Sequence, residues 1–317
     1  MHWTHRCGRQ HDEWVSATTA PEAQTRAPGR AGLTVLTAVT PAVWGTTYIV
    51  TTELLPAGHP MFAALVRALP AGLLALAISS TLPHGDWWWK AAVLGTLNIG
   101  AFFPLLFVTA ERLPGGAAAT LGAIQPIIVA FLAVVVLGER LSGWRVGWGV
   151  VGVLGVALVV LGPDAALDPI GVLAGLAGAA SVGLGITLTK RWGRPDGVGA
   201  LTFAGWQLTA GGLALLPSLL LEGVPGQVDA PAIGGYLWLG LVGGLLAYTL
   251  WFAGIRRLPV TATALLVLLS PLVAAALGLC LLGEKLTPLQ STGFVLALAA
   301  LLAGQQTAPF TKGPRHP

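Results

Sequence analysis

One side of the first apolar segment carries hydroxyl groups and aromatic rings at helical spacing. A helix would place them on a single face, because they follow one another in steps of 3, 4, 3, 1 and 3 residues: Thr37, Thr40, Trp44, Thr47, Tyr48 and Thr51. Lipid offers hydroxyl groups no partner, whereas a solute could stack on the rings and bind the Tyr48 hydroxyl. The stripe therefore predicts the wall of a binding cavity, with threonine-mediated helix packing as the alternative.

A single arginine, Arg67, lies inside the second apolar segment. A charge at the centre of a membrane-spanning helix costs about 2.5–3.5 kcal/mol on insertion scales, so it normally faces the protein interior. Its planar guanidinium could hold a carboxylate or phosphate with two parallel hydrogen bonds. A structural charge that binds backbone carbonyls, or pairs with Glu53 across the short connection at 56–59, is the open alternative.

Four further residues complete the predicted site. The candidates for substrate binding are Trp44, Thr47, Tyr48, Arg67, Gln125, Gln207, Tyr248 and Trp251. Gln207 lies 140 residues after Arg67 in a similar context, which makes it a neutral counterpart in the second half of the chain. Packing hydrogen bonds are the alternative for each of these added residues. If protons drive the process, Glu53 is the candidate for the coupling ion, because it is expected near the cavity mouth.

Two prolines interrupt corresponding apolar segments. Pro126 and Pro271 are 145 residues apart, and a proline inside a helix removes one backbone hydrogen bond and kinks the helix. Paired breaks of this kind are typical of helices that line a transport site, although a tolerated kink in a packed bundle explains them as well.

The composition decides what kind of protein holds these residues. The chain is 55% hydrophobic and only 9% charged, with a mean hydropathy of +0.77, whereas a soluble domain has roughly 25% charged residues. Breaks at Pro, Gly and charge leave apolar segments of about the length that crosses a bilayer as a helix. We predict an all-α polytopic membrane protein with ten spans near 33–55, 60–80, 88–110, 115–137, 143–162, 170–189, 199–221, 233–255, 260–282 and 287–304.

The basic residues set the orientation of these spans. Of the 17 Lys and Arg residues, 14 fall at one set of span ends, two fall at the opposite set (Arg112 and Lys285), and Arg67 lies within a span. Basic residues stay on the cytoplasmic side, so both termini are expected there. The net charge of +4 thus reflects topology and gives no reason to expect a nucleic acid partner.

The chain also repeats itself after 145 residues. Arg112-Leu113-Pro114 recurs as Arg257-Leu258-Pro259, Gly138-Glu139 recurs as Gly283-Glu284, and 13 of 32 positions agree between 110–141 and 255–286. Five spans in each half is an odd number, so the halves must be inverted relative to each other. The predicted organisation is a cytoplasmic tail (1–32), two five-helix repeats (33–162 and 163–304) and a second cytoplasmic tail (305–317).

These residues resemble the drug/metabolite transporter superfamily, EamA type. The likeness covers nearly all of 33–304 and rests on Trp44-Gly45, Arg67 and the two segments that run from a proline to Gly-Glu-(Arg/Lys)-Leu. It implies ten helices in two inverted repeats, a place in the cell membrane, and export or exchange of metabolites, amino acids or drugs without ATP hydrolysis or a cofactor. One departure is that the sixth span has only Leu184-Gly185 where the first has Trp44-Gly45.

Two other classes of function are alternatives to a transporter. A membrane enzyme acting on lipid-linked substrates needs ionisable residues gathered at one interface, and the sequence contains no Walker loop, nucleophile elbow or zinc-helix motif. A receptor or scaffold without transport activity predicts a larger soluble part than the short tails supply. We therefore expect no enzyme activity and no metal site. The expected partners are a small-molecule substrate, the lipid bilayer and coupling protons, in a monomer or a homodimer.

Overall fold

The computed structural model describes residues 29–112, 121–140, 142–160, 168–281, 283 and 287–306. These residues form helices, and no strand occurs among them. The expected tails at 1–32 and 305–317 fall mostly outside this range, as does Glu284. The side chain of Tyr48, although its backbone is helical, lies outside it too.

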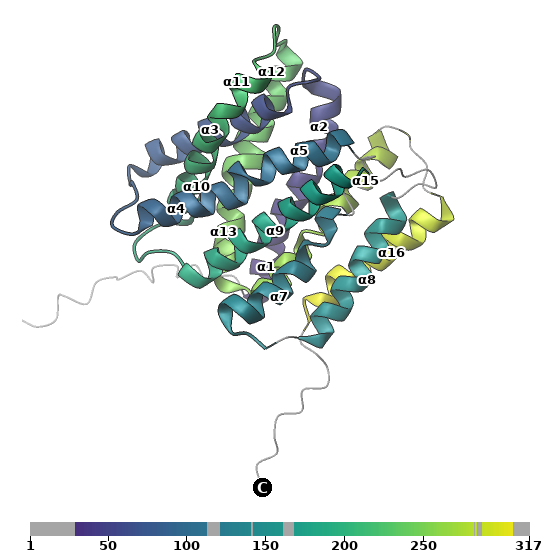
Figure 1. Cartoon of the computed structure of the whole chain (residues 1–317). Coiled ribbons are helices and arrows are strands. Elements are labelled where there is room, and N and C mark those ends of the chain that lie inside the picture. The colour runs from purple at the N-terminus through teal and green to yellow at the C-terminus, as the bar shows by residue number, and fades with distance from the viewer. Residues whose placement is uncertain are drawn as a thin grey trace, which may run out of the picture.

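The first half of the chain forms a series of helices, some of them broken within one predicted span (Figure 1). They are α1 (Arg30–Gly45), α2 (Thr47–Leu54), α3 (Pro60–Ser79), α4 (Trp87–Gly95), the π-helix η1 (Thr96–Gly100), α5 (Phe102–Arg112), α7 (Gln125–Leu137) and α8 (Gly143–Val160). Spans one and three are thus each built from consecutive helical pieces.

The second half follows the same order. It comprises α9 (Pro169–Trp192), α10 (Ala200–Leu215), the 3-10 turn η2 (Leu216–Ser218), α11 (Leu219–Glu222), α12 (Ala230–Leu237), the π-helix η3 (Trp238–Leu246), α13 (Ala247–Arg257), α14 (Val260–Leu266), α15 (Leu269–Leu281) and α16 (Pro288–Gly304). When η1 is shifted by 145 residues it falls inside η3, so the two halves carry a π-helix at corresponding places.

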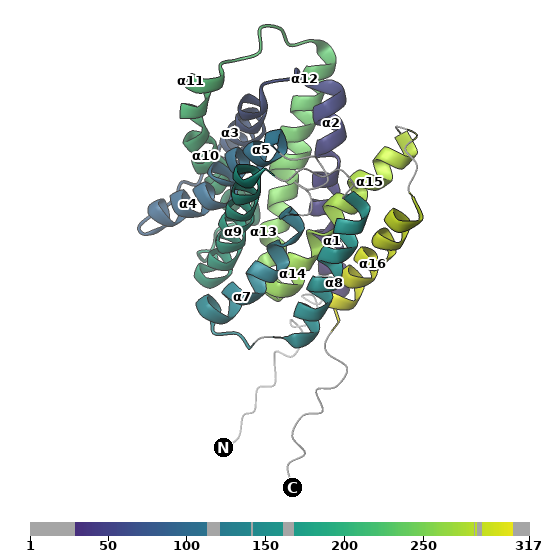
Figure 2. The ribbon, with the colours of Figure 1, turned by 45° about the vertical axis from the view of Figure 1, so that its right-hand side comes forward.

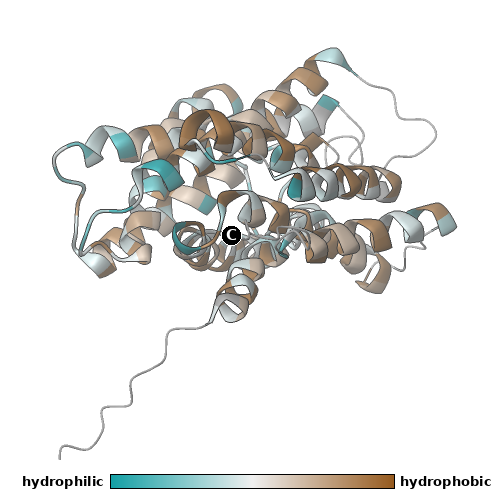
Figure 3. Ribbon diagram, turned by 90° about the horizontal axis from the view of Figure 1, so that it is seen from below, coloured by the Kyte–Doolittle hydropathy of each residue, from teal (hydrophilic) through white to brown (hydrophobic). Residues whose placement is uncertain are grey.

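The length and hydropathy of these helices are those of membrane-spanning segments. Seven helical stretches of the described chain are long and apolar enough to cross a bilayer, and three shorter apolar helices accompany them at Leu121–Leu137, Gly143–Leu158 and Pro288–Gly304. Large apolar side chains such as Val135 and Leu173 are about two-thirds exposed, at 66% and 67%. Figure 3 shows the same pattern, with apolar ribbon along the helices and polar residues concentrated at several helix ends. The outer surface therefore suits lipid contact.

Side-chain contacts tie together the helix ends that carry basic residues. Lys190, near the end of α9, donates to the carbonyls of Ile255, Arg256 and Leu258 at the end of α13. Arg191 donates to Val136 at the end of α7. We name this side of the bundle the basic end.

The opposite side holds the alternate helix ends. There the Glu222 carboxylate, at the end of α11, accepts hydrogen bonds from the N–H groups of Met61 and Phe62 at the start of α3. Arg112, at the end of α5, approaches Asp168, which caps the start of α9, at 3.7 Å. These contacts join helix ends that the sequence predicts to lie on the same side.

The two halves pack against each other in matched pairs. α3 packs on α10 through reciprocal glycines, because a Cβ on Gly72 would meet Thr209 and a Cβ on Gly212 would meet Leu69. The two contacts correspond to each other, because Gly212 lies 140 positions after Gly72 and Thr209 lies 140 positions after Leu69. Similarly α1 packs on α13 while α5 packs on α9, and α8 lies beside its counterpart α16 (Figure 2).

The prolines follow interruptions of their helices. A turn at Ile124 precedes α7, in which Pro126 is the second residue, and a turn at Val267 and Leu268 precedes α15, in which Pro271 is the third. The cause is local, since a proline has no N–H for the fourth carbonyl before it and its ring collides with that carbonyl. The two helices are thus interrupted at corresponding places in the two halves.

The first span packs on one of the two proline-containing spans. α1 packs on α14 and α15, with a Cβ on Gly45 falling 2.7 Å from Val273 Cβ. α7 instead packs on α9, where Gly183 faces Ile128, the residue 145 positions before Val273. Gly183, rather than the expected Gly185, is therefore the packing counterpart of Gly45.

Candidate functional site

Arg67 lies in the interior of the bundle, where it contacts a backbone carbonyl, a hydroxyl group and an aromatic ring. Its residue is only 9% exposed. Nη2 donates to the Gly243 carbonyl at 3.3 Å, and Nη1 lies 3.5 Å from the Thr47 hydroxyl. The guanidinium carbon lies 5.3 Å from the ring centroid of Phe103, close enough for a cation–π contact. The side chain therefore bridges α2, α5 and η3 from its position on α3.

The Gly243 carbonyl is available because η3 is a π-helix. The Ala247 N–H, which would bond Gly243 in a regular α-helix, donates to Gly244 and Val242 instead. The Gly243 carbonyl also accepts a hydrogen bond from Trp44 Nε1 at 3.0 Å. One backbone oxygen thus orients both Arg67 and Trp44. Gly243 was not among the residues predicted for the site.

Three aromatic rings gather beside Arg67. The ring centroid of Trp44 lies 5.2 Å from that of Tyr248 and 5.4 Å from that of Trp251, both in tilted arrangements. Tyr248 and Trp251 are 4% and 2% exposed, whereas Trp44 is only partly buried. The partly buried Trp44 is therefore the ring that can offer area to a solute. The structure thus brings together five of the predicted residues: Trp44, Thr47, Arg67, Tyr248 and Trp251.

The polar stripe of the first span divides into two parts. The Thr37 hydroxyl donates to Leu33 one turn earlier, and the Thr40 hydroxyl donates to the Ala247 carbonyl across the α1–α13 contact. These two threonines serve helix packing, which was the alternative interpretation. Trp44 at the end of α1 and Thr47 at the start of α2 point to the Arg67 neighbourhood instead.

Glu53 and the two glutamines take other positions. Glu53 is exposed near the end of α2, where its carboxylate accepts a hydrogen bond from Thr52. Gln207 is fully buried, and its Oε1 accepts a hydrogen bond from Asn98 at 2.8 Å. Gln125 is 6% exposed at the start of α7, and its Nε2 has no hydrogen-bond partner among the described residues. The Asn98–Gln207 bond shows that Gln207 serves the contact between η1 and α10.

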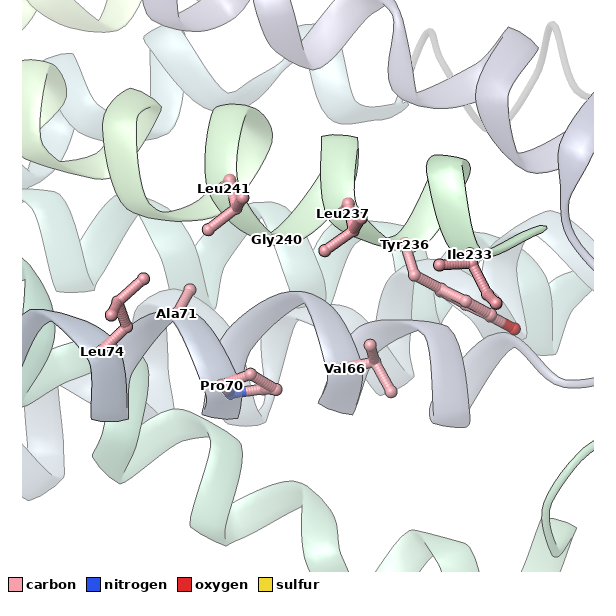
Figure 4. Close-up of a pocket in the computed structure, with 9 residues that line it drawn as sticks. All are labelled: Val66, Pro70, Ala71, Leu74, Ile233, Tyr236, Leu237, Gly240 and Leu241. Atoms are coloured by element: carbon pink, nitrogen blue, oxygen red, sulfur yellow. The ribbon is translucent and has the colours of Figure 1, made fainter. Parts of the chain in front are cut away.

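A separate apolar groove lies between α3 and the α12–η3 helix (Figure 4). Its volume is about 230 Å³, and its walls include Val66, Pro70, Leu74, Leu237 and Leu241. Several of these side chains are exposed on the outer surface. The groove is therefore distinct from the Arg67 site. The central cavity expected around Tyr48 involves a side chain that the structure does not describe, and it stays a prediction.

Comparison with known proteins places the chain in a family. The sequence model of the EamA-like transporter family matches residues 32–161 and 169–303. The chain belongs to the EamA-like transporter family. Protein PecM of Dickeya dadantii is 44% identical over 273 residues, covering 86% of this chain and 92% of PecM. The chain is therefore a multi-pass protein of a membrane transporter family.

Other relatives are more distant. A probable terminal-alkyne amino-acid exporter of Streptantibioticus cattleyicolor is 29% identical over 214 residues, covering 67% of this chain and 71% of the exporter. A crystal structure with a TM-score of 0.75 and 19% identity covers 87% of this chain and 99% of its own. At that identity the structural match shows the fold alone.

The shared Gly243 carbonyl leads to a prediction about Trp44. The variant Trp44→Phe keeps an aromatic ring but removes the N–H donor, so we expect about a fivefold loss of transport activity, the cost of one neutral hydrogen bond. The variant Trp44→Ala, which also removes the stacking surface, should lose more. Initial rates in membrane vesicles, normalised to protein amount, measure both, and an unchanged rate for Trp44→Ala would remove Trp44 from the site.

Proposed function

We propose that this protein is a secondary transporter that exports small amphipathic metabolites carrying a carboxylate, amino acids among them, by alternating access. The observation that carries the proposal is the buried Arg67, which shares the Gly243 carbonyl with Trp44 beside the rings of Tyr248 and Trp251. A guanidinium beside stacking faces suits a solute that combines an anionic group with an apolar or planar part.

The hydrogen bonds of Arg67 favour a ligand role. Its contacts with the Gly243 carbonyl and the Thr47 hydroxyl measure 3.3 and 3.5 Å, whereas an N–H to a carboxylate oxygen is typically 2.7–2.9 Å. Both of these acceptors are neutral. A substrate carboxylate would therefore give a stronger partner than either, and binding it would stabilise the charge that the apolar surroundings disfavour.

We propose the ten-span architecture of two inverted five-helix repeats as the frame for this activity, in the cell membrane. The reciprocal packing of Gly72 and Gly212 between α3 and α10, and the alternating helix ends, support it. The basic end would be cytoplasmic, since Lys and Arg stay on that side. Arg67 and Gln207 then occupy related places in the two halves, one charged and one neutral.

Thiol labelling tests this orientation. In a background in which Cys7 and Cys280 are replaced by serine, the variant Gln227→Cys lies in the connection between α11 and α12, opposite the basic end. The matched variant Asp196→Cys lies in the connection between α9 and α10, at the basic end. An impermeant thiol reagent added to intact cells should label position 227 and spare position 196. Labelling of position 196 alone would reverse the proposed orientation.

Transport by purified protein in liposomes tests the function. Amino acids, other small carboxylates and neutral analogues are compared as substrates, with and without a pH gradient and with no ATP present. We expect carboxylate-bearing solutes to move and their neutral amide analogues to move poorly. If protons are coupled at Glu53, the variant Glu53→Gln should transport without responding to the gradient. A preference for cationic or neutral solutes would contradict the proposed site.

A further inference from the structure

A small cavity at the basic end is lined by cations and aromatic rings. It lies where the end of α9, the start of α10 and the end of α13 meet, and its volume is about 70 Å³. Its walls include Thr189, Lys190, Arg194, Phe203, Phe252 and Arg256. Among the residues that the structure describes, none of those lining the cavity is acidic.

The three cations of the lining are not equivalent. Lys190 uses its three donors on the carbonyls of Ile255, Arg256 and Leu258, so it is already satisfied. Arg194 differs, because its Nε and Nη1 atoms are buried and have no hydrogen-bond partner among the described residues. Buried donors are expensive to leave unsatisfied. A ligand with hydrogen-bond acceptors would therefore satisfy the buried donors of Arg194.

The surroundings of Arg194 increase this demand. Burial, and then the nearby charges of Arg256 and Arg257, lower the pKa of the Arg194 guanidinium. Two acidic residues lie nearby, but neither neutralises the positive charge of the cavity. The charge of Glu139 interacts with Lys190, and Asp196 is exposed in the connection between α9 and α10. An anion in the cavity would offset both the lost hydration of Arg194 and the repulsion between the arginines.

We propose that this cavity binds a phosphate-type oxyanion through Arg194 and Arg256. The volume is several times the roughly 10–15 Å³ that one water molecule requires, so a tetrahedral oxyanion fits. Two sources share this chemistry: the headgroup of an anionic phospholipid, since the cavity lies at an end of the bundle where headgroups are expected, and free inorganic phosphate. This site is independent of the transport site at Arg67.

The test measures binding to the purified full-length protein in a neutral detergent. One arm titrates phosphatidylglycerol and follows bound lipid by native mass spectrometry. The other arm titrates inorganic phosphate and follows the melting temperature. The variants Arg194→Gln and Arg256→Gln are compared with Arg140→Gln, which removes one exposed charge from the same end without touching the cavity.

We expect Arg194→Gln and Arg256→Gln each to weaken binding by about tenfold in at least one arm, the loss of one charge-assisted contact. Arg140→Gln should bind like the unaltered protein. An effect confined to phosphatidylglycerol identifies the lipid as the source, and an effect confined to inorganic phosphate identifies the free anion. Equal binding by all four proteins in both arms, or no binding by the unaltered protein, would overturn the proposal. Ligand-free melting temperatures show whether a variant is folded.

Discussion

Replacing Arg67 with alanine should reduce transport by about 30-fold or more while the protein still inserts into the membrane. Losing one partner of a desolvated charge pair costs about 2–5 kcal/mol, and each 1.4 kcal/mol is a factor of ten. Insertion should survive, because removing a charge from the apolar helix α3 lowers the cost of placing it in lipid. Initial transport rates in liposomes, normalised to reconstituted protein, measure the effect.

The variant Arg67→Lys separates a geometric role from a simple charge. Lysine keeps the charge but cannot form the two parallel hydrogen bonds of a guanidinium, so it should restore little of the rate. Arg140→Ala is the control for general effects of losing a cation, since Arg140 is exposed beyond the end of α7. A well-folded Arg67→Ala protein with normal transport would show that Arg67 is structural.

The variant Gly72→Ala should destabilise the whole bundle. An added Cβ would lie 2.9 Å from the carbonyl carbon of Leu208 and closer still to the backbone nitrogen of Thr209. Since backbone atoms cannot rotate away, α3 and α10 must separate, at a cost of about 1–3 kcal/mol or more. Melting in detergent, followed by the loss of the monodisperse peak on heating, measures the change.

Two matched variants control for the effect of adding a methyl group. Gly212→Ala, with its Cβ 2.8 Å from Leu69 Cα, should be damaged similarly, because the two glycines have reciprocal roles. Gly147→Ala on α8 meets no atom within 4 Å, so it should be neutral or stabilise slightly, as alanine favours the helix. Equal melting temperatures for all three would mean that α3 and α10 do not pack as described.

The prediction of the fold from the sequence depended on the internal repeat and on the periodic spacing of residue types. The 145-residue repeat placed Pro126 and Pro271 at corresponding breaks, and the distribution of basic residues predicted which helix ends lie together. Both kinds of evidence depend on residue type and spacing alone. The same spacing predicted that Trp44 and Thr47 share a face, and both contact the Arg67 neighbourhood.

The partners within the site depend on backbone geometry, which residue types do not reveal. The Gly243 carbonyl accepts hydrogen bonds from Trp44 and Arg67 because η3 is a π-helix. The presence of a glycine in the sequence does not indicate whether its carbonyl is hydrogen-bonded within the helix. The polar stripe of the first span shows that spacing does not identify a residue's partner either. Thr40 belongs to the same stripe as Thr47, but its hydroxyl faces the Ala247 carbonyl. Gln207 was predicted at the site with a packing hydrogen bond as the alternative, and its bond to Asn98 joins two helices.

The most direct test of the account is substrate protection at position 47. Thr47 lies beside the Arg67 guanidinium, so a thiol placed there by Thr47→Cys, with Cys7 and Cys280 replaced by serine, would be covered by a bound solute. The solute that gives the fastest transport in liposomes is added before a small permeant thiol reagent. We predict that it slows labelling of position 47 in a saturable way, and that adding Arg67→Ala abolishes the protection. Labelling that the transported solute leaves unchanged would show that the transport path does not pass Arg67.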